Sequence, residues 1–142
     1  MYVISDYYKA SRDVIAFVAG YYEKLFSAEL LDQMISIQKW DTSYPMTAPK
    51  RLNLYMRNMD VDYFIFLNSN DDEWSQNIYQ LAHEYSHVVM GCYPNNERLK
   101  WISECLCESA SIHLLLIANV FFEKHSLRYV AGYLEYLVRH LS

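Results

Sequence analysis

The sequence has few of the residues that interrupt regular structure. Its 142 residues include three glycines and three prolines, which excludes collagen-like, linker-rich and low-complexity chains. Hydrophobic residues make up 53% and charged residues 20% of the chain, so intrinsic disorder is excluded and an ordinary core is allowed. Because domains average roughly 150 residues, we expect residues 1–142 to form a single domain.

Cysteine and positive charge are also scarce. The three cysteines, Cys92, Cys105 and Cys107, are too few for a full disulfide framework, and a reducing compartment is the simpler interpretation. The formal net charge of −5 argues against a nucleic-acid partner, since phosphate binding needs a basic surface. It argues equally against a polybasic patch that would bind a membrane surface.

Long hydrophobic runs are missing as well. The first residues carry no basic region of the kind that opens a signal peptide. The most apolar stretch, Ser109–Phe122, has 14 residues and contains His113 and Asn119, so it is too short to span a bilayer and is typical of a buried helix. We therefore expect a soluble, cytoplasmic protein without membrane contact, and the sequence leaves its oligomeric state open.

The order of predicted elements indicates an α+β fold. Apolar residues at helical spacing predict four helices, at 7–31 (in one or two pieces), 73–90, 97–122 and 126–141. Alternating patterns predict three short strands, at 35–37, 52–56 and 61–67. The last two are close enough to form a hairpin, and the segment 41–50 with its two prolines is predicted as a loop. The expected architecture is a small, mostly antiparallel sheet between an N-terminal helix and three later helices.

The strongest chemical signal is the sequence His-Glu-Tyr-Ser-His at residues 83–87. It lies inside a stretch with helical periodicity, where residues four apart share one face, so His83 and His87 can bind the same metal ion. Neutral imidazole suits Zn²⁺, and Glu84 lies beside the two histidines, within reach of a metal-bound water. The alternative is a pair of surface histidines next to a solvated glutamate.

Two glutamates in the following helix extend this site. Glu104 and Glu108 are the only charged residues between Trp101 and Phe122, and their spacing places them on one face. Ionised carboxylates on a buried face are costly unless they are paired, and a zinc ion would neutralise them. Glu104 would then be the third ligand and leave the fourth position for water, while Glu108 would accept the other ring N–H of a ligating histidine.

A less specific explanation exists for the same glutamates. Both can lie at the solvent edge of the helix and pair with Lys100 or Arg98. Cys105, next to Glu104, can lie near the metal, although a small packing residue is the more common role of such a cysteine.

Together the two motifs resemble those of the gluzincin zinc metallopeptidases. The second motif of that family is often written W-x-x-E-G-x-A-E, and Trp101, Glu104 and Glu108 match it. Cys105 stands where glycine is usual and Cys107 where alanine is usual. The resemblance covers about residues 61–117, and the order of elements is similar to that of the single-domain minigluzincins.

The resemblance implies a role for each residue. It implies that His83, His87 and Glu104 bind one zinc ion, that Glu84 is the general base and that Glu108 supports a ligating histidine. It also implies a zincin-like fold in which the strand before the active-site helix, Val61–Leu67, is an edge strand that holds an extended peptide.

Three functions remain compatible with the sequence. The leading one is a zinc-dependent metallopeptidase that acts on a peptide or protein substrate through water activated by Glu84. The second is a zinc-binding but non-hydrolytic domain, latent or regulatory. The third is a helical interaction domain without metal, which requires Glu104 and Glu108 to face solvent. The sequence assigns no residue to stabilisation of the oxyanion.

Overall fold

Four strands and four helices make up the described part of the chain, in a coarse α+β arrangement as expected. The computed structural model describes residues 1–41, 44–49, 60–91 and 97–125. The elements in chain order are β1 (Tyr2–Ile4), α1 (Arg12–Leu25), α2 (Ser27–Leu30), β2 (Ile35–Lys39), β3 (Met46–Pro49), β4 (Tyr63–Leu67), α3 (Trp74–Val89) and α4 (Glu97–His125).

The sheet is mixed, and the prediction of a mostly antiparallel sheet was wrong. The strand order is β1-β2-β4-β3; the pairs β1–β2 and β2–β4 are parallel, and only β3–β4 is antiparallel. Parallel neighbours need a long crossover, and α1 with α2 provides it between β1 and β2. The sequence did not reveal this connection because β1 is only three residues long and was not predicted.

Strand β3 lies inside the segment 41–50 that the sequence predicted as a loop, so that prediction was wrong over Met46–Pro49. Pro45 and Pro49 made the segment look irregular. Proline is tolerated at the boundaries of an outer strand, and β3 is the outer strand next to β4 in the described sheet. The predicted strand at 52–56, its hairpin and the predicted helix at 126–141 lie outside the described residues.

The predicted helix at 7–31 is divided into α1 and α2, with Phe26 between them. It begins later than predicted because Asp71, just before α3, holds the preceding segment in a non-helical conformation. The Asp71 carboxylate accepts hydrogen bonds from the main-chain N–H groups of Lys9, Ala10 and Ser11 at 2.8–2.9 Å. One side chain therefore fixes the start of α1 next to the start of α3.

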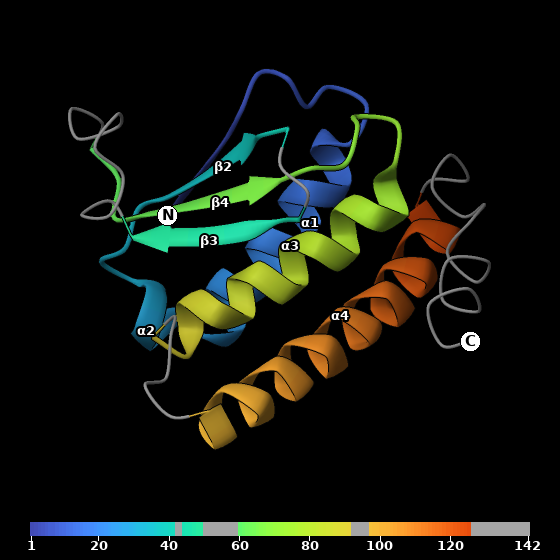
Figure 1. Cartoon of the computed structure of the whole chain (residues 1–142). Helices are drawn as coiled ribbons and strands as arrows, with labels where there is room; N and C mark the ends of the chain where they lie inside the picture. The colour runs from blue at the N-terminus through green and yellow to red at the C-terminus, as the bar shows by residue number, and fades with distance from the viewer. Residues whose placement is uncertain (42–43, 50–59, 92–96, 126–142) are drawn as a thin grey trace.

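Helix α3 lies between the sheet and α4 (Figure 1). It contacts β3 and β4 on one side and packs along α4 on the other, while α1 packs against both α3 and β1. The main core forms where one face of the sheet meets α1 and α3. Its sheet residues alternate along two strands, namely Ile35, Ile37, Ile65 and Leu67, all fully buried.

Helix α4 is longer than predicted. The apolar stretch Ser109–Phe122 is part of a segment, Arg98–Phe122, that is long and apolar enough to cross a membrane by length and composition alone. The core helix of a soluble protein meets the same criterion, so the expectation of no membrane contact stays a prediction. In the structure 33% of the apolar window of α4 is buried, and Leu115 and Ala118 are fully buried against the rest of the fold.

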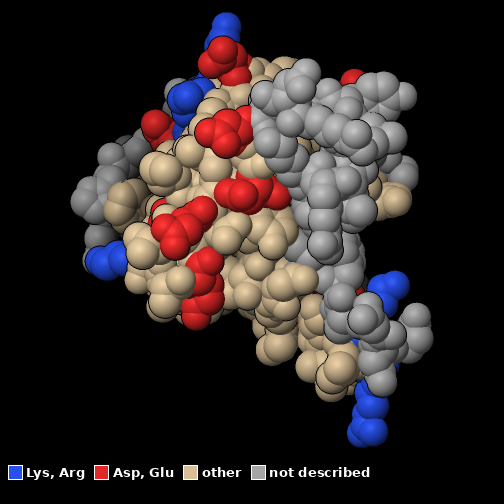
Figure 2. Space-filling model, turned by 90° about the vertical axis from the view of Figure 1, so that its left-hand side faces the viewer, with Lys and Arg blue, Asp and Glu red and all other residues tan. Residues whose placement is uncertain are grey.

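The charge of the molecule is visible on the face drawn in Figure 2. Acidic side chains lie across the middle of this face, and the lysine and arginine side chains lie toward its rim. This distribution agrees with the formal net charge of −5.

Candidate functional site

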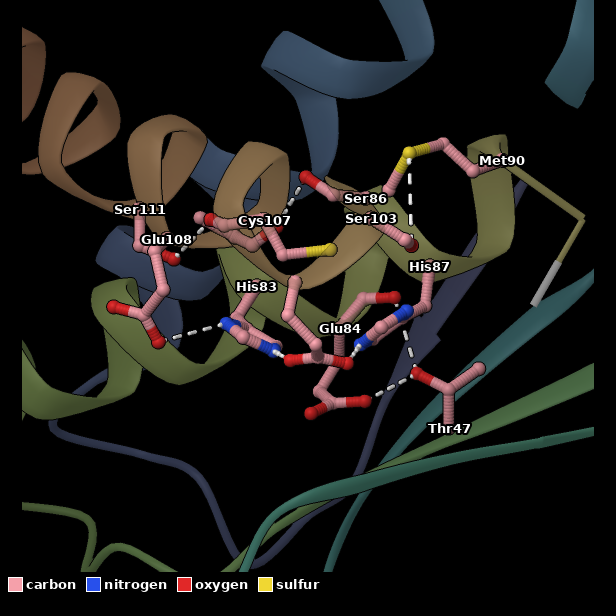
Figure 3. Close-up of polar contacts among 12 residues, drawn as sticks. Thr47, His83, Glu84, Ser86, His87, Met90, Ser103, Cys107, Glu108 and Ser111 are labelled. Carbon is pink, nitrogen blue, oxygen red and sulfur yellow. Dashed lines mark hydrogen bonds and ion pairs between the residues drawn. The ribbon is translucent and has the colours of Figure 1, made fainter. Parts of the chain in front are cut away.

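Helices α3 and α4 bring together all five residues that the sequence singled out. Figure 3 shows His83, Glu84, His87 and Glu108. His83, Glu84 and His87 project from α3, and Glu104 and Glu108 project from the facing side of α4. Their side chains line one cavity of about 630 Å³. The sequence suggested that both glutamates lie on a buried face. In the structure neither is fully buried, since 47% of the Glu104 side chain and 44% of the Glu108 side chain are exposed.

The Glu104 carboxylate bridges the two histidines. One of its oxygens lies 3.1 Å from His83 Nε2 and the other lies 3.1 Å from His87 Nε2. Two nitrogen or oxygen ligands of a tetrahedral zinc ion are separated by about 3.3 Å, given metal–ligand distances of about 2.0–2.2 Å. The chemistry of the two rings and the carboxylate suits zinc, and each nitrogen–oxygen distance is close to this value. The group of side chains whose ligand atoms all lie within 4.8 Å of one another is His83, His87 and Cys107.

Glu108 contacts the other nitrogen of the first histidine. Its Oε1 lies 3.4 Å from His83 Nδ1, and the hydroxyl of Tyr79 donates a hydrogen bond to its second carboxylate oxygen. A carboxylate in this position selects the ring tautomer that leaves Nε2 free to bind metal. Tyr79 lies one helical turn before His83 on α3, so a single face of the helix supplies both the ligand and the residue that fixes Glu108.

Glu84 is almost completely buried, with 4% of the residue exposed. Thr47 on β3 donates a hydrogen bond to Glu84 Oε2 at 2.6 Å, and the same hydroxyl contacts the main-chain oxygen of Glu84 at 3.0 Å. Burial raises the pKa of Glu84 to about 7; the Thr47 hydrogen bond opposes this rise and the Glu104 charge adds to it. A carboxylate with a pKa near neutrality is well suited to accept and return a proton.

Burial also lowers the pKa of His83 below its usual value, and His87 lowers it further, while the charge and hydrogen bond of Glu104 oppose the change. The pKa of His83 is lowered on balance, which favours the neutral imidazole. The neutral ring is the form that binds a metal ion.

The sequence did not identify two residues of the site. Cys107 is fully buried, and its ligand atom and those of His83 and His87 all lie within 4.8 Å of one another. Burial raises the pKa of its thiol to about 12, with further contributions from the charges of Glu104 and Glu84. Its spacing of three residues from Glu104 was a usable signal, since residues three apart share a helix face.

Thr47 is the second such residue, and no sequence signal marked it, because its role depends on how β3 packs against α3. Two other residues of the second motif are open to solvent. Cys105 is exposed, and Trp101 is 69% exposed.

Comparisons of the chain with known protein families, with curated proteins and with solved structures found no match. The functional interpretation therefore depends on the geometry of the site.

Proposed function

We propose that this protein is a zinc-dependent metallopeptidase with a gluzincin-like site. The observation that carries the proposal is the Glu104 carboxylate, which lies 3.1 Å from a ring nitrogen of both His83 and His87 in a cavity that Glu84 also lines. Three such ligands with a buried carboxylate beside them are the composition of a hydrolytic zinc site.

His83, His87 and Glu104 would hold the zinc ion. When bound, zinc supplies Lewis-acid chemistry, lowering the pKa of a water molecule to about 7 and polarising a substrate carbonyl. Glu108 keeps the His83 ring in the required orientation through its contact with Nδ1.

Glu84 is the proposed general base. It accepts a proton from the attacking water and returns it to the leaving amine. The Glu84 carboxylate must therefore change its protonation state near neutral pH. Thr47 supports this role through its hydrogen bond to Oε2, and Glu84 lines the cavity.

The substrate would bind along β3. The resemblance implied that Val61–Leu67 is the edge strand, but β4 is paired on both sides in the described sheet, which excludes it from strand addition. The segment Tyr44 to Met46, at the start of β3, lines the cavity instead. An extended peptide that pairs with an outer strand gains main-chain hydrogen bonds next to the ligands.

The substitution Glu84→Gln tests the proposal. We expect the purified variant to retain about one zinc per chain by mass spectrometry while peptide hydrolysis falls roughly 10²–10⁴-fold, the range that a general base contributes. Glu29→Gln, at an exposed position on α2, is the matched control and should change neither quantity.

The other outcomes are equally informative. An active Glu84→Gln protein would refute the assignment of the base. Zinc without hydrolysis in the unaltered protein would favour a latent or regulatory zinc domain, and a chain that does not bind zinc at all would exclude both functions.

A further inference from the structure

The thiol of Cys107 faces the ligands of the proposed zinc site. In Figure 3 its sulfur lies over the gap between the two imidazoles, and the Glu84 carboxylate lies on their other side. The sulfur and the nearest ring nitrogens of His83 and His87 are within 4.8 Å of one another. Cys107 is fully buried, so its side chain points into the protein interior.

This spacing is close to that of a coordinated set. With a zinc–sulfur distance of about 2.3 Å and a zinc–nitrogen distance of about 2.0–2.1 Å, sulfur and nitrogen ligands of one tetrahedral ion are about 3.5 Å apart. Side-chain movements on the order of 1 Å would close the remaining gap. Sulfur is also among the ligands that zinc prefers, so chemistry and position agree.

Helix α4 presents Glu104 and Cys107 to the same two histidines. The two residues are three apart and therefore neighbours on one helix face. Glu104 already touches both rings, and the thiol lies within 4.8 Å of a ligand nitrogen of each. Two histidines, one glutamate and one cysteine make four protein ligands, which is the number found in closed structural zinc sites, whereas hydrolytic sites keep one position open.

We propose that Cys107 is a fourth ligand of the metal and that its thiolate holds the site in a closed, low-activity state. The proposal rests on the zinc site proposed above. On closing, the S–H bond breaks, the proton goes to solvent and a sulfur–metal bond forms. On opening, the sulfur–metal bond breaks and the thiol takes a proton back, so no oxidant or reductant takes part.

Replacement of zinc by Co²⁺ tests the ligand directly, without any activity assay. A thiolate bound to Co²⁺ gives a charge-transfer absorption band in the near ultraviolet, separate from the visible bands that report metal occupancy. We expect this band in the unaltered protein and in Cys105→Ser, whose thiol is exposed on the same helix. We expect its loss in Cys107→Ser with the visible bands retained.

A second measurement avoids altering Cys107. The double substitution Cys92→Ser/Cys105→Ser leaves Cys107 as the only cysteine of the chain. X-ray absorption of its zinc form should show one sulfur at about 2.3 Å beside nitrogen and oxygen at about 2.0–2.2 Å. A shell of nitrogen and oxygen alone would overturn the proposal even if Cys107→Ser failed to fold.

The closed state is tested with Cys107→Ala. Loss of a residue that hydrogen-bonds to a metal ligand costs roughly 10–100-fold in affinity, and we expect the zinc affinity of Cys107→Ala to fall by at least this factor. Its rate of peptide hydrolysis at saturating zinc should rise. An unchanged or lower rate would overturn the closed state.

The failures of the two proposals can be told apart. Visible Co²⁺ bands without the thiolate band would exclude Cys107 as a ligand and leave the zinc site standing. A thiolate band in the unaltered protein, with no hydrolysis in either the unaltered protein or Cys107→Ala, would exclude the peptidase and the closed state. The ligand set would stand.

Discussion

Thr47 is the residue through which the sheet reaches the proposed catalytic base. Its hydroxyl is 2.6 Å from Glu84 Oε2, and a hydrogen bond to a charged group contributes about 1.5–3 kcal/mol. At about 1.4 kcal/mol per tenfold change in rate, we expect Thr47→Val to lower kcat roughly 10–100-fold, with KM and zinc content unchanged. Steady-state kinetics with a peptide substrate measure both constants.

The conservative variant Thr47→Ser is the control for this prediction. It retains the hydroxyl and should recover most of the lost kcat. A rise in KM with an unchanged kcat would mean that Thr47 contributes to peptide binding along β3 and does not position Glu84.

Residues of the site differed in how far the sequence revealed them. His83, Glu84 and His87 lie within five consecutive residues of one helix, so helical periodicity was enough to place them on adjacent faces. Glu104 and Glu108 required a second helix to lie alongside, and their charge in an apolar stretch made that placement predictable. A cysteine in an apolar helix is most often a small packing residue, so the sequence did not single out Cys107, whose proximity to the histidines depends on the packing of α3 against α4.

Among the elements, α3 ends just before a glycine. Gly91 follows the helix with φ at 80°, a left-handed conformation that costs a residue with a side chain about 1–2 kcal/mol. We expect Gly91→Ala to lower the free energy of unfolding by about that amount, measured by urea denaturation.

Gly20 provides the matched comparison. It lies within α1, and a methyl group added there would meet nothing within 4 Å. Because alanine favours helix over glycine by about 0.5–1 kcal/mol, Gly20→Ala should raise the free energy of unfolding. Shifts of the same sign in the two variants would contradict the assigned backbone conformations.

Elements with a long periodic pattern were predicted well, and short ones were not. The patterns at 73–90 and 97–122 gave α3 and α4 to within a few residues, because each has an apolar face that repeats over several turns. Strands β1 and β3 have three and four residues, too few for an alternating pattern to be distinct. The omission of β1 removed one of the two parallel pairs, and the parallel pairing of β2 with β4 has no signal in the pattern of either strand.

At the scale of the whole molecule, a bound metal would connect α3 to α4. A ligand that binds only the folded chain stabilises it by about 2.7 kcal/mol when its free concentration is 100 times Kd, which corresponds to about 5–10 °C in Tm for a chain of this size. We expect zinc to raise Tm by this amount and a chelator to reverse the change, measured by thermal unfolding.

The double variant His83→Ala/His87→Ala controls for zinc bound elsewhere. It should unfold at a temperature that neither zinc nor the chelator changes. An equal zinc-dependent shift in this variant would place the metal outside the proposed site.

The bridging of both histidines by Glu104, together with the Tyr79 contact to Glu108, has a calorimetric consequence. The protein's own side chains hold the ligand set together, so metal capture should order little additional chain and bury little apolar surface. The heat-capacity change of binding should therefore be small, in contrast to domains whose folding depends on the metal. Such a chain can gain and lose its ion while remaining folded, and its occupancy then follows the supply of metal around it.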